Sequence, residues 1–308
     1  MTILYLSHKN IDKEKWDSCI HRSQNGLIYA EYDYLENMAN HWDALVLNDF
    51  EAVMPLTWRK KLGIKYLYQP SFFQQGGIFS TIKITPSITN LFIEAAVQKF
   101  KFAEITLNYN NPLHPKQKPY VFTQRNNYVL DLKQEYNNIY KKYKPDVKES
   151  LRRLKKFNLQ YIESYDYLET ITLYKKLYQK RLPSFSEKDY DQFQKLCSIY
   201  FKQNRIIIRK VIHKESREVL AVALLLKDSK RLYNIVSCIL NQGKKMLANY
   251  FLYDCIIQEF SGEDMLFDFE GSDNKGIAYF YEKFTQTNQS YPFLKFNLLP
   301  APIRLLKS

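Results

Sequence analysis

Short runs of apolar residues alternate along the chain with amphipathic stretches of helical spacing, and this pattern predicts strands interspersed with helices. Residues 44–69 predict three short strands in a meander, with turns at Asn48-Asp49 and at Lys60–Gly63. A helix is expected from Pro86 to Phe100, because proline is tolerated in the first turn of a helix, and a strand from Ala103 to Asn108 follows. Three strands, a helix and a strand therefore form one unit.

The same order of elements recurs in the second half of the chain. Residues 205–240 predict another three-stranded meander, Met246–Phe260 a helix and Met265–Phe269 a strand. The separation between corresponding elements is similar in the two halves, and we therefore predict a duplicated α/β unit. The alternative is one unduplicated array, because strands and helices alternate in any α/β protein.

The segment between the two copies predicts a strand, two helices and a strand, and it carries the densest run of basic residues in the chain. Its second helix places Val147, Leu151 and Leu154 on one side. The basic residues lie elsewhere on it: Lys148, Arg152, Arg153, Lys155 and Lys156. Two interpretations are open. This helix has either a solvated face or a phosphate-binding surface for a nucleotide or RNA, with Arg152 and Arg153 as substrate-binding candidates.

Composition narrows the class of protein. The chain has 308 residues and a net charge of +13, which favours a polyanionic partner. Most of the basic residues are lysine, however, whereas proteins that recognise phosphates and bases specifically rely on arginine. The four cysteines have no metal-ligand or disulfide spacing, as in proteins of a reducing compartment. The longest apolar run, Val219–Leu226, is too short to span a bilayer. We expect a cytoplasmic, soluble protein without a membrane span; nucleic acid is a less favoured partner.

Several common catalytic signatures are absent from the sequence. It lacks the phosphate-binding loops G-x-x-x-x-G-K-[ST] and G-x-G-x-x-G, the nucleophile motif G-x-S-x-G and the zinc motif H-E-x-x-H. The five histidines are scattered, and none lies beside a nucleophile or a second ligand. The sequence therefore disfavours metal catalysis, and attention moves to the turns between strands and helices.

One such turn, Asn241–Asn249 (NQGKKMLAN), follows an apolar strand and opens a helix. It contains one of only eight glycines and two lysines, and helix N-termini offer free N–H groups to anions, so it suits a pyrophosphate or an acyl carbonyl. The cofactor-binding candidates are Asn241, Gln242, Gly243, Lys244, Lys245 and Asn249. The alternative is a simple connection in which Gly243 is a turn residue.

A second candidate lies in the segment LFDFEGSDNKGIAYFYEKF. Asp268 and Glu270 are two residues apart in a strand and so share one face, where either could take a proton from an attacking amine. Tyr279 and Tyr281 follow on a helix and could give a proton to a leaving group. The alternatives are a carboxylate that holds a backbone N–H or a lysine, and tyrosines that belong to the core.

A third candidate is QPSFFQQGGIF, where the neutral amides of Gln69, Gln74 and Gln75 lie among aromatic residues. Such a combination is typical of a recognition cleft, which makes Gln74 and Gln75 substrate-binding candidates. A hydrogen-bonded turn is the alternative.

Taken in order, four segments resemble the FemAB-like branch of the acyl-CoA N-acyltransferase (GNAT) superfamily, whose members carry two GNAT-type domains in tandem. They are EAVMPL at Glu51–Leu56, the Gln-Gly-Gly segment at 74–77, RRLKKFNLQ at Arg152–Gln160 and DFEGSDNKGIAYFYEKF at Asp268–Phe284. The resemblance implies an α/β (α+β) fold of two tandem GNAT-like domains. Each would be a mixed, largely antiparallel twisted sheet flanked by helices, with residues 1–135 shaping the acceptor cleft and residues 136–308 holding the acyl-donor site.

The resemblance also implies a chemistry, in which an amine attacks an activated acyl carbonyl directly. Asp268 or Glu270 would be the base, Tyr279 or Tyr281 the acid, and backbone N–H groups near Val236–Ile239 the oxyanion donors. No tightly bound cofactor is expected. Acyl-CoA or aminoacyl-tRNA would be the donor, and a small amine or a cell-envelope precursor the acceptor.

The chain departs from the family in two ways. Counted from Gln242, Lys245 and Leu247 replace the small residues of the pyrophosphate loop [QR]-x-x-G-x-[GA], and the coiled-coil arm of the Fem-type relatives is absent. A catalytically silent tandem-GNAT protein that binds a ligand or RNA therefore stays open as an alternative function, as does a plain RNA-binding protein.

Overall fold

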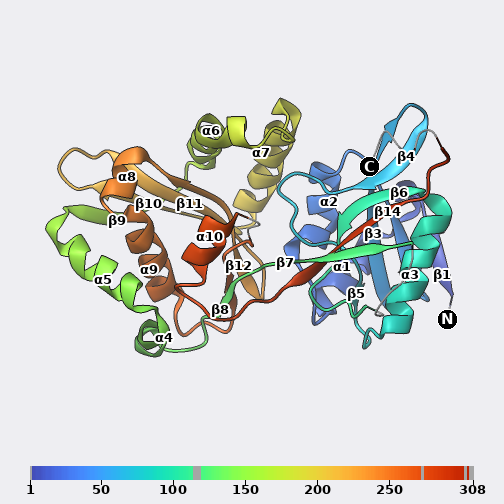
Figure 1. Cartoon of the computed structure of the whole chain (residues 1–308), viewed down its shortest axis with the longest axis horizontal. Coiled ribbons are helices and arrows are strands. Elements are labelled where there is room, and N and C mark those ends of the chain that lie inside the picture. Colours follow the sequence, from blue (N-terminus) through green and yellow to red (C-terminus); the bar gives the residue numbers. More distant parts are fainter. Residues whose placement is uncertain (1, 114–118, 272–273, 302–303, 305–308) are drawn as a thin grey trace. The chain divides into compact units, whose positions relative to one another are not determined.

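The computed structural model describes residues 2–113, 119–271, 274–301 and 304, and the chain divides into two units (Figure 1). Unit 1 consists of Met1–Arg125 together with Ser290–Ser308, and unit 2 of Asn126–Gln289. This division differs from the sequence-based boundary at 135/136, because residues 126–135 belong to unit 2 and the C-terminal residues return to unit 1. The reason is strand pairing, described below.

Unit 1 is built on one mixed sheet. Its strands run in the order β1 (Ile3–Leu6), β2 (Trp42–Leu47), β3 (Ala52–Lys61), β4 (Ile64–Tyr68), β6 (Phe102–Thr106), β14 (Tyr291–Asn297) and β7 (Val121–Arg125), with β5 (Phe79–Ser80) paired to β3. The pair β4 and β6 is parallel and the other pairs are antiparallel. The helical elements are η1 (His8–Asn10), α1 (Lys13–Arg22), η2 (Ile28–Ala30), α2 (Tyr32–Met38) and α3 (Pro86–Lys99).

Helix α3 shows how local sequence positions an element of unit 1. It begins at Pro86, and the Thr85 side chain caps it by accepting a hydrogen bond from the backbone N–H of Ile88. Its apolar face, including Phe92 and Ile93, packs against buried residues of the sheet and so forms the core of unit 1.

Unit 2 is also built on one mixed sheet. Its strands run in the order β8 (Val129–Asp131), β13 (Leu266–Asp268), β12 (Arg231–Ile239), β11 (Val219–Lys227), β10 (Ile206–His213) and β9 (Leu159–Ser164). The pair β12 and β13 is parallel and the others are antiparallel. The helical elements are α4 (Tyr136–Lys142), α5 (Pro145–Arg153), η3 (Leu154–Lys156), α6 (Tyr167–Tyr178), η4 (Gln179–Arg181), α7 (Glu187–Lys202), α8 (Asn241–Lys245), α9 (Ala248–Phe260) and α10 (Lys275–Tyr281).

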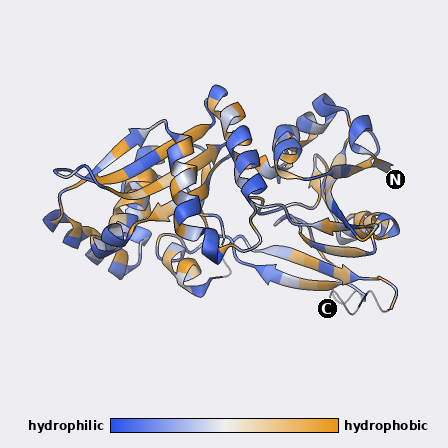
Figure 2. Ribbon diagram, turned by 90° about the horizontal axis from the view of Figure 1, so that it is seen from above, coloured by the Kyte–Doolittle hydropathy of each residue, from blue (hydrophilic) through white to orange (hydrophobic). Residues whose placement is uncertain are grey.

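The core of unit 2 centres on β11. All residues from Leu220 to Leu226 are buried, because α6 and α9 both contact this strand and cover its two faces. Figure 2 shows hydrophobic residues concentrated in the strands and hydrophilic residues along the outer faces of many helices. Within the described ranges, no helix has both the length and the apolar composition that a membrane crossing requires.

The two sheets repeat one topology, which confirms the predicted duplication. In unit 1 the meander β2-β3-β4 is followed by α3 and by the parallel strand β6, and in unit 2 the meander β10-β11-β12 is followed by α9 and by the parallel strand β13. Next to each parallel strand lies one more antiparallel strand, β14 in unit 1 and β8 in unit 2. Strand β8 follows β7 of unit 1 along the chain, and β14 follows α10 of unit 2, so the two units exchange strands reciprocally.

Candidate active site

Strands β12 and β13 of unit 2 separate after a short stretch of parallel pairing. The pairing covers Arg231–Tyr233 and Leu266–Asp268, whereas β12 continues to Ile239. A β-bulge starts the separation, because Asn234 and Ile235 together lie opposite the single residue Leu225. The described sheet therefore has an open edge along the second half of β12, at the carboxyl end of two parallel strands, where α/β folds place ligands.

Backbone donors line this open edge. The N–H of Leu240 donates to Leu220 O (N···O 3.0 Å) and so points toward β11, whereas the N–H of Ile239 donates to the hydroxyl of Tyr178 (3.4 Å) on the opposite side. Because successive N–H groups of a strand point to opposite sides, the N–H of Ser237 points toward the open edge together with that of Ile239. Both lie within Val236–Ile239, the segment where we expected oxyanion donors.

A buried hydrogen-bond network lies against the open edge. The hydroxyl of Tyr253, on α9, donates to Ser237 Oγ (3.0 Å) and accepts from Asn234 Nδ2 (2.9 Å), and it is also hydrogen-bonded to Tyr281 of α10. Burial raises the pKa of Tyr253 and that of Tyr281, which keeps both phenols protonated. Within the described residues Asn234 Oδ1 is a buried acceptor without a hydrogen-bond partner. Sequence reasoning included Tyr281 and the backbone of Ser237, and missed Tyr253, Asn234 and the side chain of Ser237.

Asp268 is completely buried and its oxygens are occupied. Its Oδ2 accepts from Arg231 Nη1 (2.8 Å) and from Asn127 Nδ2 (3.1 Å), and its Oδ1 accepts from the backbone N–H of Glu270 (3.0 Å). This geometry matches the alternative of a carboxylate that holds a cation and a backbone N–H. It argues against Asp268 as a base, because both of its oxygens already accept hydrogen bonds from neighbouring groups and are not presented to an amine.

Glu270 is partly buried and has an unusual backbone conformation. Its φ is +59°, and Asp268 holds its N–H, as described above. The next residue, Gly271, donates its N–H to Asn127 Oδ1 (2.9 Å), and a Cβ atom there would lie 1.7 Å from Asn126 O, so only glycine fits. The charge of Glu270 contributes to the raised pKa of Tyr281, after the larger effects of burial and of Tyr253.

The two tyrosines of α10 differ in position. The side chain of Asn274 accepts hydrogen bonds from the N–H groups of Gly276 and Ile277, which starts α10 and directs Tyr281 into the network. Tyr279 is 57% exposed, and the ammonium group of Lys283 lies 4.7 Å from its ring centre. Only Tyr281 therefore joins the candidate active site.

The predicted anion-binding turn follows the end of β12 directly. Asn241, Gln242, Lys244 and Lys245 are exposed on the short helix α8, and Asn249 is half-buried in the first turn of α9. Gly243 is buried, and a Cβ atom there would lie 2.1 Å from Leu220 O. Glycine at 243 therefore allows α8 to contact β11, as in the simple connection that we considered as the alternative.

The corresponding gap in unit 1 is closed by its own residues. Strands β4 and β6 pair only at Leu67–Tyr68 and Ala103–Glu104, and beyond this point Gln69 Oε1 accepts from the backbone N–H of Thr106 (3.0 Å) and from its Oγ1 (2.9 Å). Gln69 Nε2 donates to Gln74 O (3.1 Å). The side chain of Gln69 thus bridges the two strands where unit 2 is open.

The other predicted substrate-binding residues make local contacts. Gln75 is fully buried, donates from Nε2 to Gln74 Oε1 (2.9 Å) and accepts the N–H of Tyr109 (3.0 Å), as expected of a hydrogen-bonded turn. Arg152 and Arg153 are exposed on α5, and Arg152 Nη1 lies 3.5 Å from Glu149 Oε2. In the described part of the chain, no three or more His, Cys, Asp or Glu side chains form a group that could hold a metal ion.

Comparisons with known proteins support the fold. No protein-family model matches the chain, and no curated protein matches it significantly. Among solved structures, FemX is similar over 100% of both chains, with a TM-score of 0.64 and 12% sequence identity. A tandem GNAT protein from the clavulanic acid biosynthesis pathway covers 97% of this chain and 100% of its own (TM-score 0.55, 8% identity).

A third similar structure is the C-terminal domain of a protein described as a lysylphosphatidylglycerol synthetase, from Agrobacterium fabrum. It covers 96% of this chain and 94% of its own, with a TM-score of 0.57 and 11% identity. These identities are too low to show more than the fold. The chain has a FemAB-like, tandem GNAT-type fold.

Proposed function

We propose that this protein is an acyltransferase that moves an acyl or aminoacyl group from an activated donor to an amine, at the open edge of β12. The observation that carries the proposal is the combination of the outward N–H of Ser237 on β12 with the buried network of Tyr253, Tyr281 and Asn234. The fold similarity to FemX and to a tandem GNAT protein supports the same class of reaction.

In the proposed reaction the donor carbonyl lies against β12 and its oxygen accepts the N–H of Ser237. The amine nitrogen attacks the carbonyl carbon, and the oxyanion that forms is stabilised by this fixed donor. Glu270 takes the proton that the amine loses. The bond to the leaving group then breaks, and Tyr281, whose raised pKa keeps it protonated until that step, gives its proton to the departing atom.

The turn at Asn241–Asn249 would hold the donor. Its exposed lysines and the N-terminus of α9 lie directly after the open strand, and they suit the phosphates of CoA or of the acceptor end of a tRNA.

A catalytically silent protein is the second candidate. The pairing of Asp268 with Arg231 favours it, because this pairing removes one of the two carboxylates that could act as a base. Such a protein would bind the donor at β12 without transferring its acyl group.

Binding and turnover separate the two candidates. Thermal unfolding is first measured with acetyl-, succinyl- and long-chain acyl-CoA and with aminoacyl-tRNA, using free CoA and bulk RNA as controls. A donor at 100 times its Kd should stabilise the protein by about 2.7 kcal/mol. A transfer assay then compares Glu270→Gln and Tyr281→Phe with the matched control Tyr279→Phe. Loss of turnover in the first two variants alone supports the enzyme; donor binding without turnover supports the silent protein; no binding of any donor overturns both.

A further inference from the structure

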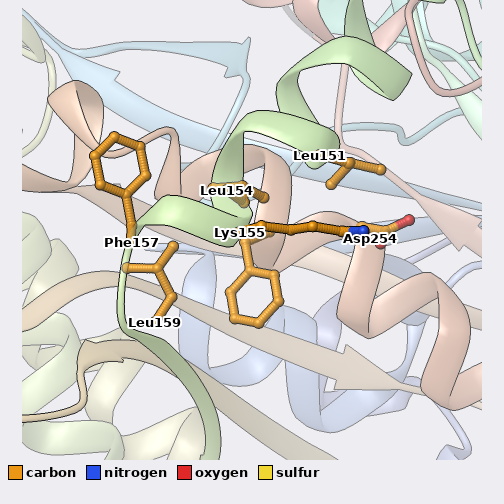
Figure 3. Close-up of a pocket in the computed structure, with 7 residues that line it drawn as sticks. Leu151, Leu154, Lys155, Phe157, Leu159 and Asp254 are labelled. Carbon is orange, nitrogen blue, oxygen red and sulfur yellow. The ribbon is translucent and has the colours of Figure 1, made fainter.

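Unit 2 contains a cavity of ≈ 290 Å³ that shares no residue with the network at β12 (Figure 3). It lies between α9 and the segment that runs from the end of α5 through η3 to the start of β9. Its volume is close to the lower end of the range of about 300–1,000 Å³ that small-molecule pockets occupy. This volume accommodates a small metabolite.

The wall of the cavity is apolar apart from two charged side chains. The apolar residues are Leu151, Leu154, Phe157, Leu159 and Phe251. The charged residues are Lys155, from η3, and Asp254, from α9 (Figure 3). The cavity thus offers one basic group, one acidic group and a hydrophobic surface.

Asp254 lacks a counter-ion among the residues that the structure describes. Its Oδ1 accepts from the hydroxyl of Tyr136 (2.8 Å), which is a neutral donor. Burial raises the pKa of this carboxyl, against the smaller opposite effects of Tyr136 and Tyr143. Asp254 is half-buried and lines the cavity, and no ion pair joins it to another described residue, so its carboxylate can accept a cationic group of a ligand.

Lys155 is the complementary group. Its side chain is exposed and, within the described ranges, it takes part in no ion pair or hydrogen bond. An ammonium group on the wall of an apolar cavity attracts a carboxylate, which gains a charge-assisted hydrogen bond there. The same cavity therefore presents one unpaired charge of each sign.

We infer that this cavity binds an apolar α-amino acid. The ligand ammonium pairs with Asp254, the ligand carboxylate with Lys155, and the ligand side chain packs on the five leucine and phenylalanine residues. A ligand with only one charge would leave Lys155 or Asp254 unpaired, and a polar side chain would lose its hydration without a partner on the wall. The inference does not rest on the proposed transfer reaction.

Isothermal titration of the full-length protein tests this inference with L-leucine and L-phenylalanine as probes. Each is compared with its amine and its acid, namely isopentylamine and phenethylamine, and 4-methylpentanoate and 3-phenylpropanoate. We expect at least one of the two amino acids to bind, and the loss of either charge to weaken binding at least tenfold, because each removes one ion pair. Absence of binding by both amino acids, or equal binding of an amine or an acid, would overturn the inference.

Three variants locate the binding. Asp254→Asn and Lys155→Gln should each weaken binding of the amino acid at least tenfold. Lys156 is an exposed neighbour that does not line the cavity, so Lys156→Gln should leave the Kd unchanged. Retained affinity in both cavity variants would refute this location. If Asp254→Asn fails to fold, Lys155→Gln and the analogues of the unaltered protein still decide the question.

Discussion

The ion pair between Arg231 and Asp268 allows a quantitative test of the architecture of unit 2. The side chains are 3% and 1% exposed and the distance from Nη1 to Oδ2 is 2.8 Å. Arg231→Met removes the guanidinium and leaves a buried carboxylate with only neutral donors. Breaking a buried pair in this way costs about 3–5 kcal/mol. Each kcal/mol lowers the Tm of a unit of this size by ~2–4 °C, so the thermal unfolding midpoint of unit 2 should fall by roughly 6–20 °C.

Calorimetry, together with hydrogen exchange of the β12 and β13 amides, measures this loss in unit 2. The double variant with Asp268→Asn should lose less than the sum of the single variants, because no bare charge is left. The control is Lys295→Met, which breaks the half-exposed pair with Glu104 (3.1 Å) in unit 1 and should cost less than ~1 kcal/mol. If Arg231→Met costs no more than this control, or if the two single effects simply add, the argument for a buried pair is wrong.

Three further predictions follow from other positions. Gly243→Ala should destabilise unit 2 by about 1–3 kcal/mol, since its Cβ would meet Leu220 O at 2.1 Å; an unchanged denaturation midpoint would contradict this. Asp254→Asn should raise the Tm at pH 7 but not at pH 3. Because the pKa of this carboxyl is raised in the folded state, its contribution to stability is fully present below its ordinary pKa and is lost as pH rises through the folded-state pKa. An equal rise in Tm at both pH values would refute this prediction. The titratable groups that face Asp254 are Tyr136, Tyr143, Lys155 and Cys255. Under the proposed reaction, Tyr281→Phe should lower turnover about 100-fold and Tyr279→Phe should leave it unchanged. Steady-state kinetics with a donor that binds the protein measures this, and full activity of the Tyr281→Phe variant would contradict the proposed role.

The elements of the fold could be predicted from the sequence because each obeys a local rule. Pro86 opens α3, the apolar run of β11 identifies a buried strand, and the repeated order of elements indicates two units. The exchange of β8 and β14 could not be predicted. Residues 126–128 carry no glycine or proline at the crossover, and hydrogen-bond partners far along the chain decide which sheet a strand joins.

The candidate site was only partly predictable for a similar reason. Tyr281 and Glu270 lie together in one segment, and their chemistry is visible in the sequence. Tyr253 lies in an apolar helix, where an aromatic residue at helical spacing resembles any core residue. Asn234 and Ser237 did leave a signal, because they are polar residues in the mostly apolar run that follows Arg231 in this strand. The arginine partner of Asp268 lies 37 residues away and had no local signal.

The exchange of strands also affects the order in which the chain can fold during its synthesis. Multidomain proteins commonly fold from the N-terminus as they leave the ribosome. Among the strands that the structure describes, all those of the unit 2 sheet precede residue 290, whereas β7 of unit 1 pairs with β14 alone and β14 also lies against β6. Until Tyr291–Asn297 have been made, the sheet translated first lacks an inner strand and exposes the edge of β6. The unit that is translated second is therefore the first that can be completed, and the nascent unit 1 must wait for it.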